Sequence, residues 1–157
     1  MTHEYLLWIA TFAYSLHAFE EFELNWRDWA RNILRLPVDW TSFYLANSIV
    51  VVLGVCCASV GWRAPWFALA LPALMLINAT FFHLLPTLVT RVYSPGLATA
   101  LLFFYPLGIW CYYGAHRDGI LTLTQSLLSF LAGAAIMASP IILLKIKSWP
   151  MFTYQNR

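Results

Sequence analysis

The order of apolar and polar positions divides the chain into five apolar segments joined by short polar connections. A membrane-spanning helix needs about 20 apolar residues, within a range of about 17–25, and each segment is close to that length. None of the segments alternates apolar and polar residues as a half-buried strand does. We therefore expect one all-α domain over residues 1–157, a polytopic membrane helical bundle of about five transmembrane helices. The predicted spans are roughly 5–22, 43–61, 66–85, 98–114 and 126–144.

The composition agrees with a membrane protein. The 157 residues are 61% hydrophobic and only 10% charged, with a mean hydropathy of +0.68, whereas soluble domains carry about 25% charged residues. The net charge of +2 is small and its charges are scattered, so we expect no nucleic-acid partner. Cys56, Cys57 and Cys111 lie in apolar segments without metal-binding spacing, and we expect them to be small buried hydrophobic residues.

The distribution of basic residues predicts the orientation of the bundle. No Lys or Arg precedes the first apolar segment, so we expect a retained span and not a signal peptide. Seven of the nine basic residues lie on one side of the predicted membrane, and only Arg63 and Arg117 lie on the other. This bias places the N-terminus outside and the C-terminus in the cytoplasm. The seven residues are Arg27, Arg31, Arg35, Arg91, Lys145, Lys147 and Arg157.

Two adjacent carboxylates end the first predicted span, in the sequence H-A-F-E-E that begins at His17. Residues three and four apart share one helix face, so His17, Glu20 and Glu21 lie together, and Tyr14 joins that face. An acid at mid-bilayer costs roughly 2.5–3.5 kcal/mol and less near the interface. Something cationic is therefore expected to compensate the two carboxylates.

His83 is the natural partner of this motif. The first and third predicted spans run in the same direction, and both inner histidines lie near the cytoplasmic ends, whereas His3 and His116 fall on the outer side. Taken singly, each motif is also explained by a packed histidine or by hydrated interfacial acids. The possibility that both inner histidines converge on the acids favours a common site.

Two imidazoles with one or two carboxylates are typical ligands of Zn²⁺ or Fe²⁺. The motif resembles H-x-x-E-H of the inverted zinc proteases, in which the outer residues bind zinc and the middle Glu is the base. By this analogy His17, Glu21 and His83 bind the metal and Glu20 is the general base. Glu21 stands where a second histidine would be, so the roles of Glu20 and Glu21 remain interchangeable. Asn47, at the inner end of the second span, is a candidate hydrogen-bond partner or weak ligand. Asn78 is a weaker candidate, because it lies about 140° from His83 on an ideal helix.

These residues resemble the HXXEE domain family of bacterial membrane proteins. The marks of that family are the H-x-x-E-E motif, a second histidine and a Y-x-P-G motif, which stand here at His17, His83 and Tyr93 in fitting order over about residues 5–115. The resemblance implies an inner-membrane location and supports the site, but it says little about a substrate. Physically, Y-S-P-G is a turn that enters the fourth span. Because it lies on the cytoplasmic side, Tyr93 can cap the site, orient a ligand or donate a proton.

A basic stripe follows the motif, because Arg27, Arg31 and Arg35 recur every four residues. If the first helix continues unbroken, the stripe extends the face of His17 and forms a cationic entrance for an anionic headgroup. The simpler interpretation is an interfacial anchor.

Our leading hypothesis is a membrane-embedded metal-dependent enzyme, a hydrolase of a lipid or lipophilic small molecule at the cytoplasmic leaflet, with Glu20 and Tyr93 as catalytic residues. A di-iron membrane oxidase is an alternative, but it needs more carboxylates than this motif supplies. A metal or proton transporter and a structural role are the non-enzymatic alternatives. An oligomer is compatible with each of them.

Overall fold

Helices form nearly all of the computed structural model, which describes residues 2–147, apart from the side chains of residues 143 and 145–147. No strand occurs in this described part. Arg157 and the side chains of Lys145 and Lys147, which contributed to the predicted orientation, lie outside the described residues.

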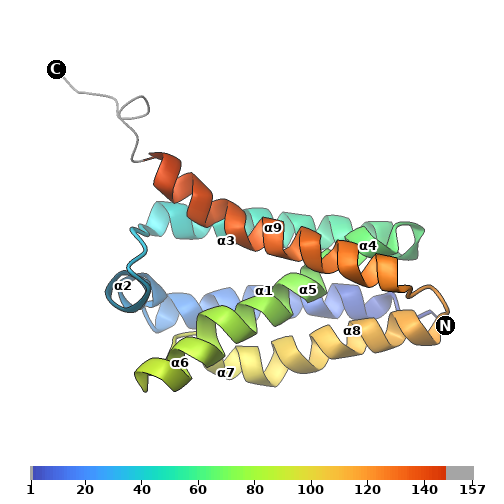
Figure 1. Cartoon of the computed structure of the whole chain (residues 1–157), viewed down its shortest axis with the longest axis horizontal. Coiled ribbons are helices and arrows are strands. Elements are labelled where there is room, and N and C mark those ends of the chain that lie inside the picture. The colour runs from blue at the N-terminus through green and yellow to red at the C-terminus, as the bar shows by residue number, and fades with distance from the viewer. Residues whose placement is uncertain (1, 148–157) are drawn as a thin grey trace.

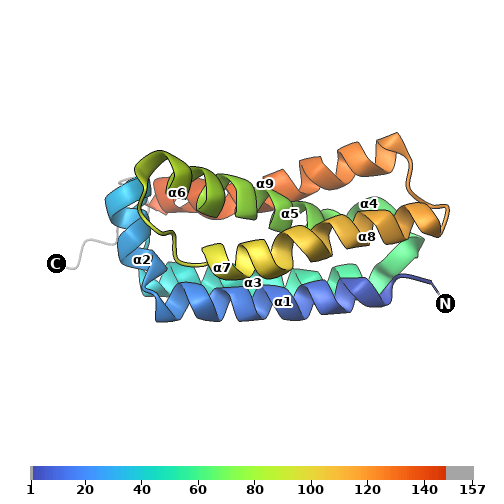
Figure 2. The same ribbon diagram turned by 90° about the horizontal axis from the view of Figure 1, so that it is seen from below.

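The helical segments form five rods that lie side by side (Figure 1, Figure 2). The first rod is α1, the second α3 with η2, the third α4 to α6 with η3, the fourth α7 and α8 with η4, and the fifth α9. α2 and η1 cross one end of the bundle. The bounds are α1 Tyr5–Glu23, α2 Trp26–Trp29, η1 Ala30–Leu34, α3 Trp40–Val60, η2 Gly61–Arg63, α4 Pro65–Ala68, α5 Ala70–Asn78, η3 Ala79–Leu84, α6 Leu85–Thr90, α7 Leu97–Thr99, η4 Ala100–Phe104, α8 Tyr105–Arg117 and α9 Leu123–Lys147.

Four of the rods are long and apolar enough to cross a membrane, among the described residues: Trp40–Arg63, Pro65–Thr90, Leu97–Arg117 and Leu123–Ile142. The chain is therefore a membrane protein with an all-helical fold. The predicted first span is the helix α1, which lies beside the others but is not one of these four. Its imidazole and its carboxylates keep its hydropathy below that of these four rods. The residues that suggest chemistry thus weaken the membrane signal of their own helix.

The third rod is the centre of the bundle. Within its apolar window 61% of the residues are buried, against 11% for the fifth rod, and α5 packs against α1, α3, α8 and α9. α9 approaches it closely because Gly133 has no side chain: a Cβ there would lie 2.7 Å from the backbone nitrogen of Leu74. Small residues at such a contact are typical of membrane helix packing.

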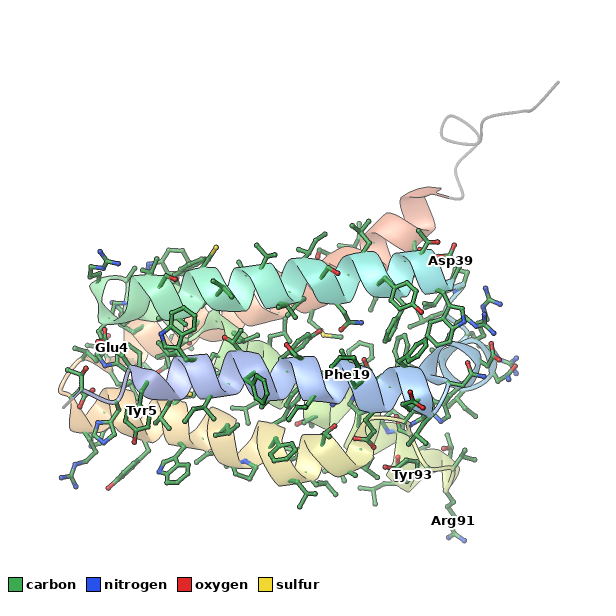
Figure 3. The ribbon with its side chains drawn as sticks, turned by 180° about the vertical axis from the view of Figure 1, so that it is seen from behind. Glu4, Tyr5, Phe19, Asp39, Arg91 and Tyr93 are labelled. Atoms are coloured by element: carbon green, nitrogen blue, oxygen red, sulfur yellow. The ribbon has the colours of Figure 1, made fainter. Side chains whose placement is uncertain are left out.

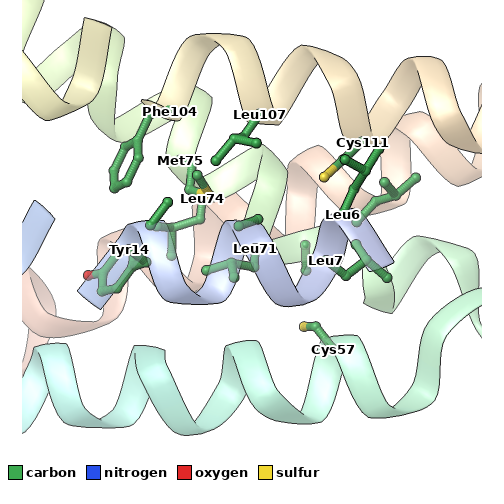
Figure 4. Close-up of a cluster of buried hydrophobic side chains, with 14 of the residues drawn as sticks. Leu6, Leu7, Tyr14, Cys57, Leu71, Leu74, Met75, Phe104, Leu107 and Cys111 are labelled. Atoms are coloured by element: carbon green, nitrogen blue, oxygen red, sulfur yellow. The ribbon is translucent and has the colours of Figure 1, made fainter. Parts of the chain in front are cut away.

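An apolar core fills the space between α1, α5 and α8 (Figure 4). Leu7, Leu71 and Leu74 are almost fully buried there, as is Cys111. Cys57 is also buried, in agreement with the prediction, but Cys56 is exposed, so the prediction was wrong for it. Adjacent helical residues point about 100° apart, and only one of this pair can face the core.

The two ends of the bundle carry different polar clusters. Figure 3 shows Glu4 and Tyr5 at one end, and Asp39, Arg91 and Tyr93 at the other. The first end is closed by a set of hydrogen-bonded residues: His3, Glu4, Trp62 and Asp118. We call them the outer clip, after the side on which the sequence predicts this end. The second end holds the predicted site.

Candidate metal centre

His17, Glu21 and His83 meet inside the bundle, and we call these three residues the ligand group. Nε2 of His17 and Nε2 of His83 each lie 3.6 Å from the same atom, Oε1 of Glu21. The ligand atoms all lie within 4.8 Å of one another. His17, Glu21 and His83 are 1%, 5% and 0% exposed. The prediction that the two inner histidines converge on the carboxylate pair is thus met for Glu21.

Helix periodicity and parallel packing produce this meeting. His17 and Glu21 are one turn apart on α1, so both face the third rod. That rod runs in the same direction as α1 (Figure 2). It brings Nε2 of His83 within 3.6 Å of the Glu21 carboxylate. The imidazole rings of the two histidines lie 4.7 Å apart, nearly perpendicular to each other.

His83 lies in a π-helical segment, η3, which is followed closely by Pro86. In an α-helix the carbonyl of Phe82 would accept the amide of residue 86, but proline has no amide to donate. The hydroxyl of Ser94 donates to the Phe82 oxygen instead, at 3.1 Å. The same hydroxyl lies 3.0 Å from Nδ1 of His83. Ser94 therefore repairs the helix and contacts the histidine with one oxygen atom.

Glu20 points away from the ligand group, toward the start of the fourth rod. Its carboxylate accepts hydrogen bonds from the amides of Ala98 (3.2 Å) and Thr99 (2.8 Å). It also accepts the hydroxyls of Thr99 (2.5 Å) and Tyr93 (2.7 Å). Glu20 thus caps a helix N-terminus, where a negative charge is favourable. Thr99 Oγ1 also lies 2.8 Å from Nδ1 of His17, so Glu20 reaches the ligand group through one intervening hydroxyl.

The Y-S-P-G segment contributes three contacts to this end. Tyr93 bonds to Glu20, and Ser94 lies against His83. Gly96 has a positive φ of 97°, and a Cβ there would lie 2.6 Å from Cε1 of His83 and 2.7 Å from Cε1 of His17. A glycine is required for both reasons, since its backbone packs directly on the imidazoles. The segment is the expected turn, and it is also one wall of the site.

Aromatic rings form another wall of the site. The ring of Phe104 lies 4.2 Å from that of His17, and Tyr14 stacks on Phe104 at 5.8 Å. The Tyr14 hydroxyl donates to Asn47 at 2.9 Å. Tyr14 and Asn47 therefore support the site from outside and supply no atom to the ligand group. Asn78 is buried and contacts the sulfur of Met137 through Nδ2, at 3.8 Å.

The arginine stripe does not extend the face of His17. α1 ends at Glu23, and Asn25 adopts the left-handed conformation with a φ of 56°, so the chain turns before the stripe begins. Arg27 bonds to Asp28 and lies over the Trp40 ring. Arg31 donates to the carbonyl of Val38. A continuous cationic face requires an unbroken first helix. The helix is broken here, because asparagine readily adopts the left-handed conformation that ends a helix.

Four residues that contact the site were not among the predicted site residues: Phe104, Thr99, Ser94 and Gly96. The last two stand within the Y-S-P-G motif, so that motif was the available signal. Thr99 has no sequence signal, because its contact depends on where the fourth rod begins.

The protein is thus a helical membrane protein whose described residues hold one buried group of two imidazoles and a carboxylate. It belongs to the HXXEE family, described as "Protein of unknown function with HXXEE motif", whose sequence profile matches residues 8–111. The chain is also similar to a Bacillus subtilis protein described as "Uncharacterized protein YrkK". The two are 28% identical over 141 residues, which cover 85% of this chain and 89% of the relative. No solved structure matches the chain.

Proposed function

We propose that this chain is a membrane-embedded metal-dependent hydrolase, in which the ligand group binds one divalent cation, Zn²⁺ or Fe²⁺. The observation that carries the proposal is the environment of the two Nε2 atoms. Both are buried and face the same carboxylate oxygen, and neither has a hydrogen-bond partner among the described residues. Buried polar atoms without partners are costly, and a cation between them would satisfy all three ligands at once.

The spacing of the ligand atoms fits such an ion. Zinc binds nitrogen and oxygen at about 2.0–2.2 Å, which separates neighbouring ligands of a tetrahedral site by about 3.4 Å. The two observed separations of 3.6 Å are close to this value. They are also too long for hydrogen bonds between imidazole and carboxylate. Modest side-chain movement would therefore be sufficient for binding.

The number of ligands favours catalysis over a purely structural ion. Structural zinc sites have four protein ligands, whereas catalytic sites have three and keep one position for water or substrate. A cation held by His17, Glu21 and His83 would supply Lewis-acid chemistry at that position. The carboxylate of Glu20 already accepts four hydrogen bonds, so we assign it a positioning role and not that of the general base. Tyr93 retains the capacity to donate a proton at the edge of the site.

The substrate we propose is a lipid or another lipophilic small molecule that enters from the cytoplasmic leaflet of an inner membrane. The positive-inside bias supports this side, because the connections that carry Arg27, Arg31, Arg35 and Arg91 lie at the end of the bundle that holds the ligand group. Arg63 and Arg117 lie at the other end. Since the ligand group is buried, entry requires displacement of the wall formed by Tyr93 to Gly96.

A second candidate is binding or transport of a metal ion without a chemical reaction. The burial of all three ligands favours it, because an enclosed ion site needs no room for a substrate. The test that separates the two candidates is an assay of purified protein in proteoliposomes. Hydrolysis of ester lipids without metal flux supports the hydrolase, and metal flux without product supports the transporter.

Metal content is the first measurement. The wild-type protein, purified without chelators, is expected to hold about one Zn or Fe per chain, and His17→Ala and His83→Ala are expected to hold none. His116→Ala is the matched control, since this histidine is exposed at the end of α8, far from the ligand group. A wild-type protein that takes up no metal when Zn²⁺ or Fe²⁺ is added would exclude both candidates.

A further inference from the structure

Two hydroxyl groups lie behind the ligand group, one on each histidine. Thr99 Oγ1 is 2.8 Å from Nδ1 of His17, and Ser94 Oγ is 3.0 Å from Nδ1 of His83. The two hydroxyls belong to different segments of the chain, and they contact different hydrogen-bond acceptors. Each nevertheless leaves Nε2 of its histidine directed at Glu21.

The direction of the first hydrogen bond follows from counting protons. A threonine hydroxyl has one proton to donate. Around Thr99 Oγ1, the carboxylate of Glu20 at 2.5 Å and the carbonyl of Gly96 at 3.2 Å can only accept. The short contact to Glu20 uses the hydroxyl proton. His17 must then donate from Nδ1, and in a neutral imidazole this leaves Nε2 with a free lone pair.

The same count applies to His83. Around Ser94 Oγ, the carbonyls of Phe82 at 3.1 Å and Pro95 at 3.5 Å can only accept. The Phe82 carbonyl receives no hydrogen bond from the backbone of residue 86, because that residue is proline and has no N–H. The serine proton is directed to it, so His83 also donates from Nδ1 and leaves Nε2 unprotonated.

We propose that Thr99 and Ser94 are positioning residues that hold both histidines in the tautomer with Nδ1 protonated, and that Glu20 acts on His17 through Thr99. This extends the proposed metal site, because only unprotonated Nε2 atoms can bind a cation. Metal-binding histidines commonly donate their other nitrogen to a carboxylate, a carbonyl or water, which fixes the ring and its tautomer. Here a hydroxyl stands between each histidine and the final acceptor.

The arrangement explains why the motif contains two glutamates. Glu21 faces the Nε2 atoms, and Glu20 faces the hydroxyl behind His17. A glutamate at position 20 also caps the fourth rod, so the start of that rod and the proton on His17 are set by one carboxylate. Their positions on the helix, three and four residues after His17, direct them to different neighbours.

Nitrogen NMR of metal-free protein with isotope-labelled histidine tests the inference without any bound metal. His3 and His116 are assigned by replacing them one at a time. In the wild type, His17 and His83 are both expected to carry the proton on Nδ1. Thr99→Val is expected to move the proton of His17 to Nε2, the nitrogen that free imidazole side chains prefer to protonate, and to leave His83 unchanged. Ser94→Ala is expected to do the reverse.

Conservative variants separate positioning from general structure. Thr99→Ser keeps the hydroxyl and is expected to keep the wild-type tautomer of His17, whereas Thr99→Val removes it at nearly constant volume. In each variant the tautomer of the other histidine is measured as well. An unchanged tautomer there shows that the fold is intact. A proton on Nε2 of either residue in the wild type overturns the proposal, and this result needs no variant to fold.

A titration with Co²⁺ or Zn²⁺ provides the second measurement. Loss of either hydroxyl is expected to weaken metal binding by roughly 10–100-fold, the range found for groups that orient metal ligands. Equal affinity in wild type, Thr99→Val and Ser94→Ala would contradict the positioning role. If the wild type binds no metal although its tautomers are as expected, the proposed function fails and the hydrogen-bond assignment stands.

Discussion

The two ends of the bundle each bring histidine and carboxylate together, with opposite results. In the outer clip, Asp118 accepts the ring of His3 at 2.6 Å, the backbone amide of His3 at 2.6 Å and the indole of Trp62 at 2.8 Å. In the ligand group, Glu21 meets two imidazole nitrogens at 3.6 Å, and neither is hydrogen-bonded to a described residue. The same residue types therefore form a closed structural contact at one end and an incomplete one at the other.

The difference lies in the direction of the donors. In the outer clip the hydrogen-bond donors point at the carboxylate of Asp118, so this carboxylate needs no cation. In the ligand group the hydroxyls of Thr99 and Ser94 stand behind the rings, so that three acceptors face one another. Residue types alone do not distinguish a metal site from an ion pair. What distinguishes them is which nitrogen of each histidine already takes part in a hydrogen bond.

Replacing Glu21 by Gln is expected to have the largest effect, which is a loss of metal affinity in the ligand group. The variant should lose metal binding by more than about 100-fold, because a ligand is removed and not only an orienting group. At the same time the Gln amide can donate to one or both Nε2 atoms, so the thermal stability of the metal-free protein should remain unchanged or increase. The measurements are metal titration and thermal unfolding in detergent.

Asp118→Asn is the matched control for this prediction, since it should lower thermal stability and leave metal binding intact. A metal-free Glu21→Gln protein that is clearly less stable than the wild type would indicate that Glu21 forms an ordinary ion pair with a charged histidine.

Gly96→Ala is expected to have the next largest effect. The new Cβ would lie 2.6 Å and 2.7 Å from the two imidazoles, at a φ of 97°. Overpacking costs about 1–3 kcal/mol and the positive φ about 1–2 kcal/mol, so stability and metal affinity should both fall. Gly119→Ala is the control, because its φ is 75° but nothing lies within 4 Å of the added Cβ. Equal loss of stability in both variants would mean that Gly96 is needed only for its backbone conformation.

The sequence was sufficient to predict the helical rods and the ligand group, and the reasons are physical. Hydropathy and length determine where a membrane helix lies. Helix periodicity places His17 and Glu21 on one face, and parallel spans bring His83 to them. These features are local or depend only on chain direction, so a single sequence contains them.

The remainder of the site depends on details that periodicity does not carry. Glu20 was expected beside the metal, but its carboxylate caps the fourth rod, and that depends on where the rod begins. The contact of Ser94 arises from a π-helical segment next to Pro86. The arginine stripe would have continued the face of His17 only in an unbroken helix, and Asn25 ends that continuity.

Asp118→Asn tests the contribution of the outer clip to stability. The variant should lose about 1–2 kcal/mol, because the donors of His3 and Trp62 keep a weaker acceptor. Burial raises the pKa of Asp118, but the hydrogen bonds from His3 and Trp62 outweigh it and lower the pKa to about 2. A carboxyl whose pKa is lower in the folded state stabilises the fold above its ordinary pKa of about 3.9. That stabilisation is lost as the pH falls toward about 2.

Thermal unfolding of wild type and variant from neutral pH down to about pH 2 measures this contribution. The difference between the two proteins should be largest above about pH 4 and should shrink below it. A difference that does not change with pH would show that the charge of Asp118 contributes nothing to the outer clip.

Tyr93→Phe is expected to have the smallest effect. Tyr93 is 48% exposed, and its hydroxyl is only one of the four donors to Glu20, so its removal should cost about 0.5–1.5 kcal/mol. Burial and the hydrogen bond to Glu20 raise the pKa of Tyr93 above its ordinary value. The bond is therefore intact below about pH 10 and is lost only as the pH rises through that raised pKa.

Metal affinity in Tyr93→Phe should fall less than in Thr99→Val, since Thr99 still connects Glu20 to His17. If Tyr93→Phe instead abolishes lipid hydrolysis while metal content stays at the wild-type level, Tyr93 acts as the proton donor of the reaction and not merely as a support for Glu20.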